Sequence, residues 1–170
     1  MELNGVGAYQ TVSGLSGLSG ANSFRQANFS AQLNFPESKE HIQKFNQLLK
    51  ESPLDDRVPT AKSLAKKGYT EDPGCRTPGK TFTDKNDNVI NIVGFNNDAG
   101  QKSVCVTYIQ KNGSSQKVIY DADGNPVKGK IKNMPKAPGD PVEIFEYEFD
   151  IEGTPFLTKY NYENPSIHHE

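Results

Sequence analysis

Beyond Gly79 the chain is a series of short strand-like runs joined by turn-forming residues, and this pattern restricts the fold more than any other feature. The links between the runs are too short for the dozen or so residues that a parallel crossover needs. The sequence therefore predicts an antiparallel β-meander of about six or seven strands. The runs are rich in Val, Ile, Thr, Phe and Tyr, and the strands are expected at 80–84, 88–95, 102–110, 116–121, 126–132, 142–150 and 155–162.

Two helices are predicted before the strands. The second, about 60–67, has Thr60 as a plausible N-cap and Gly68 as its end. The first, about 38–51, is stopped by Pro53 and carries an apolar stripe of Ile42, Phe45, Leu48 and Leu49. Helices followed by a meander indicate an α+β fold, with two short helices packed on one face of the sheet.

The N-terminal segment differs sharply in composition from the rest of the chain. Residues 1–36 carry two charged side chains, Glu2 and Arg25, and are otherwise mostly Gly, Ser, Asn, Ala and Gln. Such a segment buries too little apolar surface to fold alone. We expect a flexible leader over 1–36, or one that orders on a partner, and a single α+β domain over 37–170.

The last strands alternate between an aromatic and a charged face. We expect the aromatic face to be buried against the helices; it consists of Phe145, Tyr147, Phe149 and Ile151, with Phe156, Tyr160 and Tyr162 on the partner strand. Charged residues form cross-strand pairs on a solvated face, with an anionic ligand for the lysine row as the alternative. These residues are Lys128, Lys130 and Lys132, then Glu146, Glu148 and Asp150, and finally Lys159.

Residues 74–81 satisfy the phosphate-binding pattern GxxxxGK[ST]. That site needs an apolar strand before the loop and a helix that begins at the lysine. The preceding residues 66–73 are polar, and residues 81–84 alternate like a strand. We interpret the match as a coincidence in a linker and predict no nucleotide cofactor.

No metal or catalytic site is predicted. Residues 121–125 and 84–88 are acidic, but they lack the Gly and Glu positions of an EF-hand, and hairpin turns explain them better. The histidines are His41, His168 and His169, of which the adjacent pair chelates poorly. Cys75 lies in a loop and Cys105 in a strand; a loop thiol with a core cysteine, or a disulfide between the two, both remain open.

Two resemblances accompany this pattern, and neither assigns a family. Residues 120–127 (Tyr-Asp-Ala-Asp-Gly-Asn-Pro-Val) resemble the Tyr-Asp-x-x-Gly unit of β-repeat proteins of bacterial surfaces, with 82–88 as a degenerate second copy. The order helix, helix, meander is similar to small α+β folds of outer-membrane assembly lipoproteins and proteinaceous β-lactamase inhibitors. A lipobox cysteine is missing.

Charge and hydropathy narrow the classes of function. A net charge of −2 gives no support for nucleic-acid binding, and no apolar run is long enough for a membrane span. The N-terminus does not read as a Sec signal peptide, so we expect either secretion by a non-Sec route or a cytoplasmic location.

The favoured interpretation is a non-catalytic protein-binding or assembly module that presents a sheet face or hairpin loops to another protein. Its leader resembles the non-cleaved leaders of bacterial type III export substrates, which would imply a secreted bacterial protein. One alternative is an intracellular adaptor or chaperone. Another is a small enzyme with a cleft between sheet and helices, using carboxylates or tyrosines near Asp72, Asp84, Glu146 or Tyr160.

Overall fold

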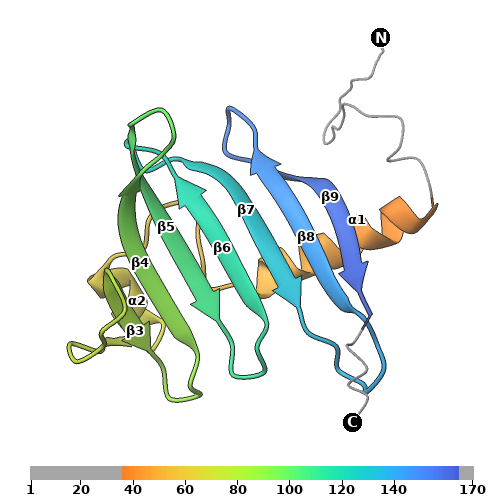
Figure 1. Ribbon diagram of the computed structural model, residues 1–170, viewed down its shortest axis with the longest axis horizontal. Helices are drawn as coiled ribbons and strands as arrows, with labels where there is room; N and C mark the ends of the chain where they lie inside the picture. The colour runs from red at the N-terminus through yellow and green to blue at the C-terminus, as the bar shows by residue number, and fades with distance from the viewer. Residues whose placement is uncertain (1–35, 165–170) are drawn as a thin grey trace. The chain divides into compact units, whose positions relative to one another are not determined.

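The computed structural model describes residues 36–164, which contain two helices and eight strands (Figure 1). The chain divides into two compact units, Met1–Leu48 and Leu49–Glu170. The predicted leader lies outside the described residues except for Pro36, and its boundary with a 37–170 domain stays a prediction.

Helix α1 spans Pro36–Glu51 and confirms the first predicted helix. It begins two residues earlier than expected, since proline is compatible with the first turn of a helix. Its packing on the sheet stays a prediction. Neither helix within residues 36–164 has the length and apolar character needed to cross a membrane.

The strands form one antiparallel sheet in which each strand pairs with its neighbour in sequence. All seven predicted strands are present, and each boundary differs from its predicted position by at most one residue. The predicted number was too low because Thr70–Glu71 forms a further two-residue strand on β3, too short and polar to recognise from periodicity. The strands are β2 (Thr70–Glu71), β3 (Lys80–Thr83), β4 (Val89–Asn96), β5 (Lys102–Ile109), β6 (Ser115–Tyr120), β7 (Pro126–Asn133), β8 (Val142–Phe149) and β9 (Pro155–Glu163).

Helix α2 (Ala61–Lys66) starts at the predicted N-cap. The backbone N–H of Ser63 donates to Thr60 Oγ1 at 3.0 Å, and the backbone N–H of Thr60 donates to Ser63 Oγ at 2.9 Å, which completes a capping box. The chain leaves the helix at Gly68, whose φ of 89° favours glycine. Both predicted ends of this helix are therefore confirmed.

One face of the sheet, called here the inner face, packs against α2 and the segment that precedes it. Tyr120 Oη donates to the carbonyl of Asp55 at 3.0 Å, and Ser52 Oγ donates to Oε1 of Gln116, so residues 52–60 are held on β6. The prediction that α2 packs on one sheet face is confirmed. The buried cluster comprises Leu64, Tyr69, Phe82, Ile90, Val106, Val118 and Tyr120.

A β-bulge in β9 changes which side chains share a face. Phe145 pairs with Tyr160, but Tyr147 pairs with Leu157, so the extra residue is Thr158. Tyr160 therefore lies on the inner face, whereas Phe156 lies on the opposite face beside Lys159. The prediction that Phe156 joins the buried aromatic face is wrong. Ile151 is also misplaced by the alternation, because it lies in a turn and is fully exposed.

Five of the hairpin connections use the same five-residue turn. In each, the first residue and the fifth are joined by an N–H···O=C bond, and the fourth donates back to the first. An Asp or Asn side chain at the first position also accepts two backbone N–H bonds in four of the five turns. The turns span 84–88, 97–101, 110–114, 121–125 and 150–154.

Candidate functional site

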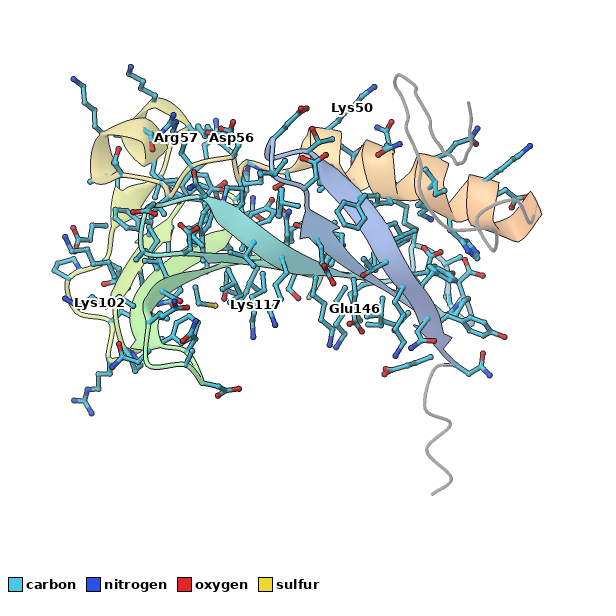
Figure 2. The ribbon with its side chains drawn as sticks, turned by 90° about the horizontal axis from the view of Figure 1, so that it is seen from above. Lys50, Asp56, Arg57, Lys102, Lys117 and Glu146 are labelled. Atoms are coloured by element: carbon cyan, nitrogen blue, oxygen red, sulfur yellow. The ribbon has the colours of Figure 1, made fainter. Side chains whose placement is uncertain are left out.

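The face of the sheet opposite the inner face is called here the open face. Figure 2 shows Lys117 and Glu146 projecting from it, on the side away from Asp56 and Arg57. At β3 and β4 the loop before β3 lies on this face, because Asn91 Nδ2 donates to the carbonyl of Pro78 at 3.1 Å. On β6–β9 the side chains of this face are exposed or half-buried. Its outward side chains are therefore the part of this unit best placed to meet another molecule.

Cross-strand pairing arranges the open face of β6–β9 in three rows. Strands β6, β7, β8 and β9 contribute one residue each to every row, because directly paired residues share a face. The central row is Lys117, Lys130, Glu146 and Lys159; the flanking rows are Ile119, Lys128, Glu148 and Phe156, and Ser115, Lys132, Ile144 and Asn161. Five lysines and two glutamates thus lie among aliphatic and aromatic side chains, a set called here the lysine band.

The predicted charge pairs are confirmed in register. Lys130 pairs with Glu146, and Lys128 pairs with Glu148. Within residues 49–164, however, ion pairs join Lys67 to Asp55 at 2.8 Å and Lys111 to Asp87 at 3.7 Å, and none joins two residues of the lysine band. Five ammonium groups against two carboxylates leave this surface with an excess of positive charge.

The neighbouring part of the open face, on β4 and β5, carries no charge. Its large side chains are half-buried or exposed, with Phe95 at 38% and Ile109 at 42% exposure. Phe156, at 45%, extends the exposed apolar surface on the far side of the lysine band. The uncharged side chains are Val89, Asn91, Val93 and Phe95 of β4 and Ser103, Cys105, Thr107 and Ile109 of β5.

A shallow groove of about 430 Å³ lies at the end of the sheet where the turns 121–125 and 150–154 meet the segment before α2. The nine residues that line it include no hydroxyl, thiol or imidazole; their ionisable side chains are four carboxylates and one guanidinium. Two of its carboxylates, Asp121 and Asp150, hold backbone N–H groups of their own turns. Its residues are Asp56, Arg57, Asp121, Asn125, Pro126, Asp150, Ile151, Glu152 and Gly153.

The buried tyrosines serve the fold. Burial raises the pKa of Tyr147 to about 12 although Gln116, which donates to its Oη at 2.8 Å, acts in the opposite direction. Burial likewise raises the pKa of Tyr120, whose hydroxyl holds the Asp55 carbonyl. Both phenols stay protonated at neutral pH, so their hydroxyls act as structural hydrogen-bonding groups.

The four residues named for an enzymatic site do not meet. Asp72 follows β2 and accepts the backbone N–H of Gly74 at 3.1 Å. Asp84 begins the first turn; burial opposes its ionisation, but hydrogen bonds from Asn88 outweigh it and lower the pKa of this carboxyl. Glu146 lies on the open face, whereas Tyr160 lies on the inner face and donates to Glu143 Oε2 at 2.8 Å.

The structure confirms that residues 74–81, which match the phosphate-binding pattern, lead into a strand and not into a helix. Lys80 begins β3, where a phosphate-binding loop needs a helix. Gly79 has a φ of 83°, and a Cβ there would collide with the backbone of Ile92 on β4. The close approach of β4 to the backbone at position 79 therefore explains why this residue is glycine.

Both cysteines are free thiols. Cys75 lies in the loop, as predicted, and hydrogen bonding to Thr77 lowers the pKa of its thiol. Cys105 lies in β5, as predicted, but it is half-buried on the open face and is not part of the core.

Residues 36–164 contain no group of three His, Cys, Asp or Glu side chains arranged to hold a metal ion. The acidic segment 121–125 is the predicted hairpin turn, with a φ of 84° at Gly124. His41 lies on α1, and the prediction about His168 and His169 falls outside the described residues.

Comparisons of the chain with protein-family models, with curated proteins and with solved structures find no match.

Proposed function

We propose that this chain is a non-catalytic protein-binding module whose open face holds an acidic surface of another protein. The observation that carries the proposal is the lysine band, where five lysines and two glutamates stand among exposed and half-buried apolar side chains. Protein interfaces combine an apolar centre with polar groups that orient the partner. Here the uncharged surface of β4 and β5 supplies the apolar part, and the lysines supply the polar groups that orient the partner.

The electrostatics favour a partner with excess negative charge. Lysine ammonium groups that have no carboxylate within ion-pair distance among residues 36–164 attract an acidic surface at long range and orient it on arrival. Their aliphatic stems also cover apolar surface, so contact with the band need not exclude Ile119, Ile144 or Phe156. A basic partner would instead be repelled.

Capture from the cells that make the protein tests the proposal. The full-length chain is immobilised beside the variant Lys117→Glu/Lys130→Glu, which reverses two charges of the central row. The matched control is Lys85→Glu, an exposed lysine in the 84–88 turn. Wild type and control are expected to retain the same acidic partner, and the double variant to bind it at least about tenfold more weakly.

The proposal is contradicted if the double variant retains that partner with unchanged affinity, or if the retained partner contacts another surface in a hydrogen-exchange footprint. Circular dichroism and the thermal midpoint of each variant establish that the substitutions leave the fold intact. All three lysines have exposed side chains, so little change in stability is expected.

A further inference from the structure

Residues 49–164 carry two surfaces of opposite charge. The lysine band on the open face is positive, whereas the end of the sheet around the groove is negative. There Asp56, Asp121, Asp150 and Glu152 lie around one cation, Arg57. The chain therefore carries, on one unit, both a basic surface and an acidic surface of the kind proposed as its partner.

The β8–β9 turn adds an apolar anchor to the acidic end. Ile151 is fully exposed and lies between Asp150 and Glu152. The turn is well determined by its own hydrogen bonds, because Asp150 Oδ1 accepts the backbone N–H groups of Glu152 and Thr154 at 2.9 Å each. A preorganised turn loses little conformational entropy when it binds.

The open face offers the complementary arrangement. Ile119 is half-buried and pairs directly with Lys128, and Ile144 is half-buried and pairs directly with Lys132. Each isoleucine is thus an aliphatic spot beside an ammonium group. An isoleucine flanked by carboxylates matches such a surface in both polarity and charge.

From this match we infer that the open face binds the β8–β9 turn of a second copy of the chain. The inference rests on the proposed function, since it uses the same face and names one acidic partner for it. One copy supplies the face and the other supplies the turn, so each copy in a pair keeps one surface unused. Such a heterologous contact builds open filaments, unless the rotation between successive copies closes them into a ring.

Sedimentation and light scattering on the full-length chain give the first test. The mean mass is expected to rise with protein concentration at low salt and to fall as salt is added, because screening weakens contacts between exposed charges. Either Lys117→Glu/Lys130→Glu or Ile151→Ser/Glu152→Lys alone is expected to raise the dissociation constant of self-association at least about tenfold. The control Lys85→Glu is expected to associate like the wild type.

Mixing the two double variants gives the sharper test. The face variant keeps an intact turn, and the turn variant keeps an intact face, so the mixture is expected to form a one-to-one dimer and nothing larger. A wild-type chain that stays monomeric at all concentrations and salts overturns the inference, as does a mixture that stays monomeric.

If the wild type is monomeric while the face variant still loses its cellular partner, the inference fails and the proposed function stands. If self-association behaves as expected but no foreign partner depends on the face, the proposed function fails for other proteins.

Discussion

Gly129 of β7 lies directly opposite Tyr147 of β8, and the ring of Tyr147 occupies the space that a side chain at position 129 would take. A Cβ on Gly129 would lie 2.7 Å from Cε1 of Tyr147 and closer still to its Cζ. Tyr147 is 1% exposed and accepts a hydrogen bond from Gln116, so its ring has little freedom to move aside. This glycine is therefore a packing requirement of the inner face.

Gly129→Ala is expected to lower the free energy of unfolding by about 1–3 kcal/mol, the usual cost of overpacking. Urea denaturation measures it. The matched control is Gly94→Ala, since Gly94 also lies in a strand and the nearest atom to its Cβ would be 3.8 Å away. There, removal of glycine's backbone entropy is expected to leave stability unchanged or raise it by up to about 1 kcal/mol. Equal effects at both positions would contradict the packing argument.

The raised pKa of Tyr147 predicts a loss of stability at alkaline pH. Its folded-state pKa of about 12 exceeds the ordinary value of 10.0, so the folded state keeps the proton longer. The contribution is complete below about pH 10 and falls as pH rises from there through about pH 12. Between about pH 9 and pH 11, wild type is expected to lose roughly 1 kcal/mol more than Tyr147→Phe.

Denaturation curves at the two pH values measure this difference, with Tyr162→Phe as the control because Tyr162 is 60% exposed. At neutral pH, Tyr147→Phe itself is expected to cost about 1–3 kcal/mol, since the buried amide of Gln116 loses its acceptor. An identical alkaline loss in wild type and Tyr147→Phe would show that this phenol is not the titrating group.

The shared turn predicts a clear contrast between two substitutions at one residue. Asp121 Oδ1 accepts the backbone N–H groups of Asp123 at 3.0 Å and Asn125 at 2.9 Å. Asp121→Ala removes both bonds and is expected to cost about 1–2 kcal/mol. Asp121→Asn keeps the accepting oxygen, as Asn97 does in its own turn, and is expected to cost much less. Thermal unfolding of the two variants checks the order. A purely electrostatic role for Asp121 would make the two variants equal, because both lose the same charge.

Within residues 36–164, Asp87 is the one non-glycine residue with a left-handed backbone conformation, at a φ of 64°. It occupies the fourth turn position, where the other four turns have Gly100, Gly113, Gly124 and Gly153. Since a Cβ is disfavoured in this conformation, Asp87→Gly is expected to raise the free energy of unfolding by up to about 1 kcal/mol. The exposed contact with Lys111 is lost too, so Lys111→Ala serves as the control for that pair. A destabilised glycine variant beside a neutral Lys111→Ala would refute the conformational argument.

Much of the candidate site could be predicted from the sequence, because its elements depend on near neighbours. The alternation around Lys128–Lys132 and Glu146–Asp150 placed the two charged rows, and the register confirms two of their pairs. Three of the five turns carry Asp or Asn followed three residues later by Gly, at 97–100, 121–124 and 150–153. The sequence predicted hairpin turns at 84–88 and 121–125, and both are present. Alternation also placed Lys159 on the charged face, but it did not show that Lys117 completes the central row.

The sequence by itself determined the strands, their order and their turns, because two-residue alternation and glycine at left-handed positions act within a few residues of the chain. Tertiary structure decided the rest. The bulge at Thr158 turns Phe156 to the open face, the two residues of β2 acquire strand geometry only by pairing with β3, and Ile151 is left at a turn tip. These outcomes depend on hydrogen bonds and packing between segments distant in sequence, and no local pattern encodes them.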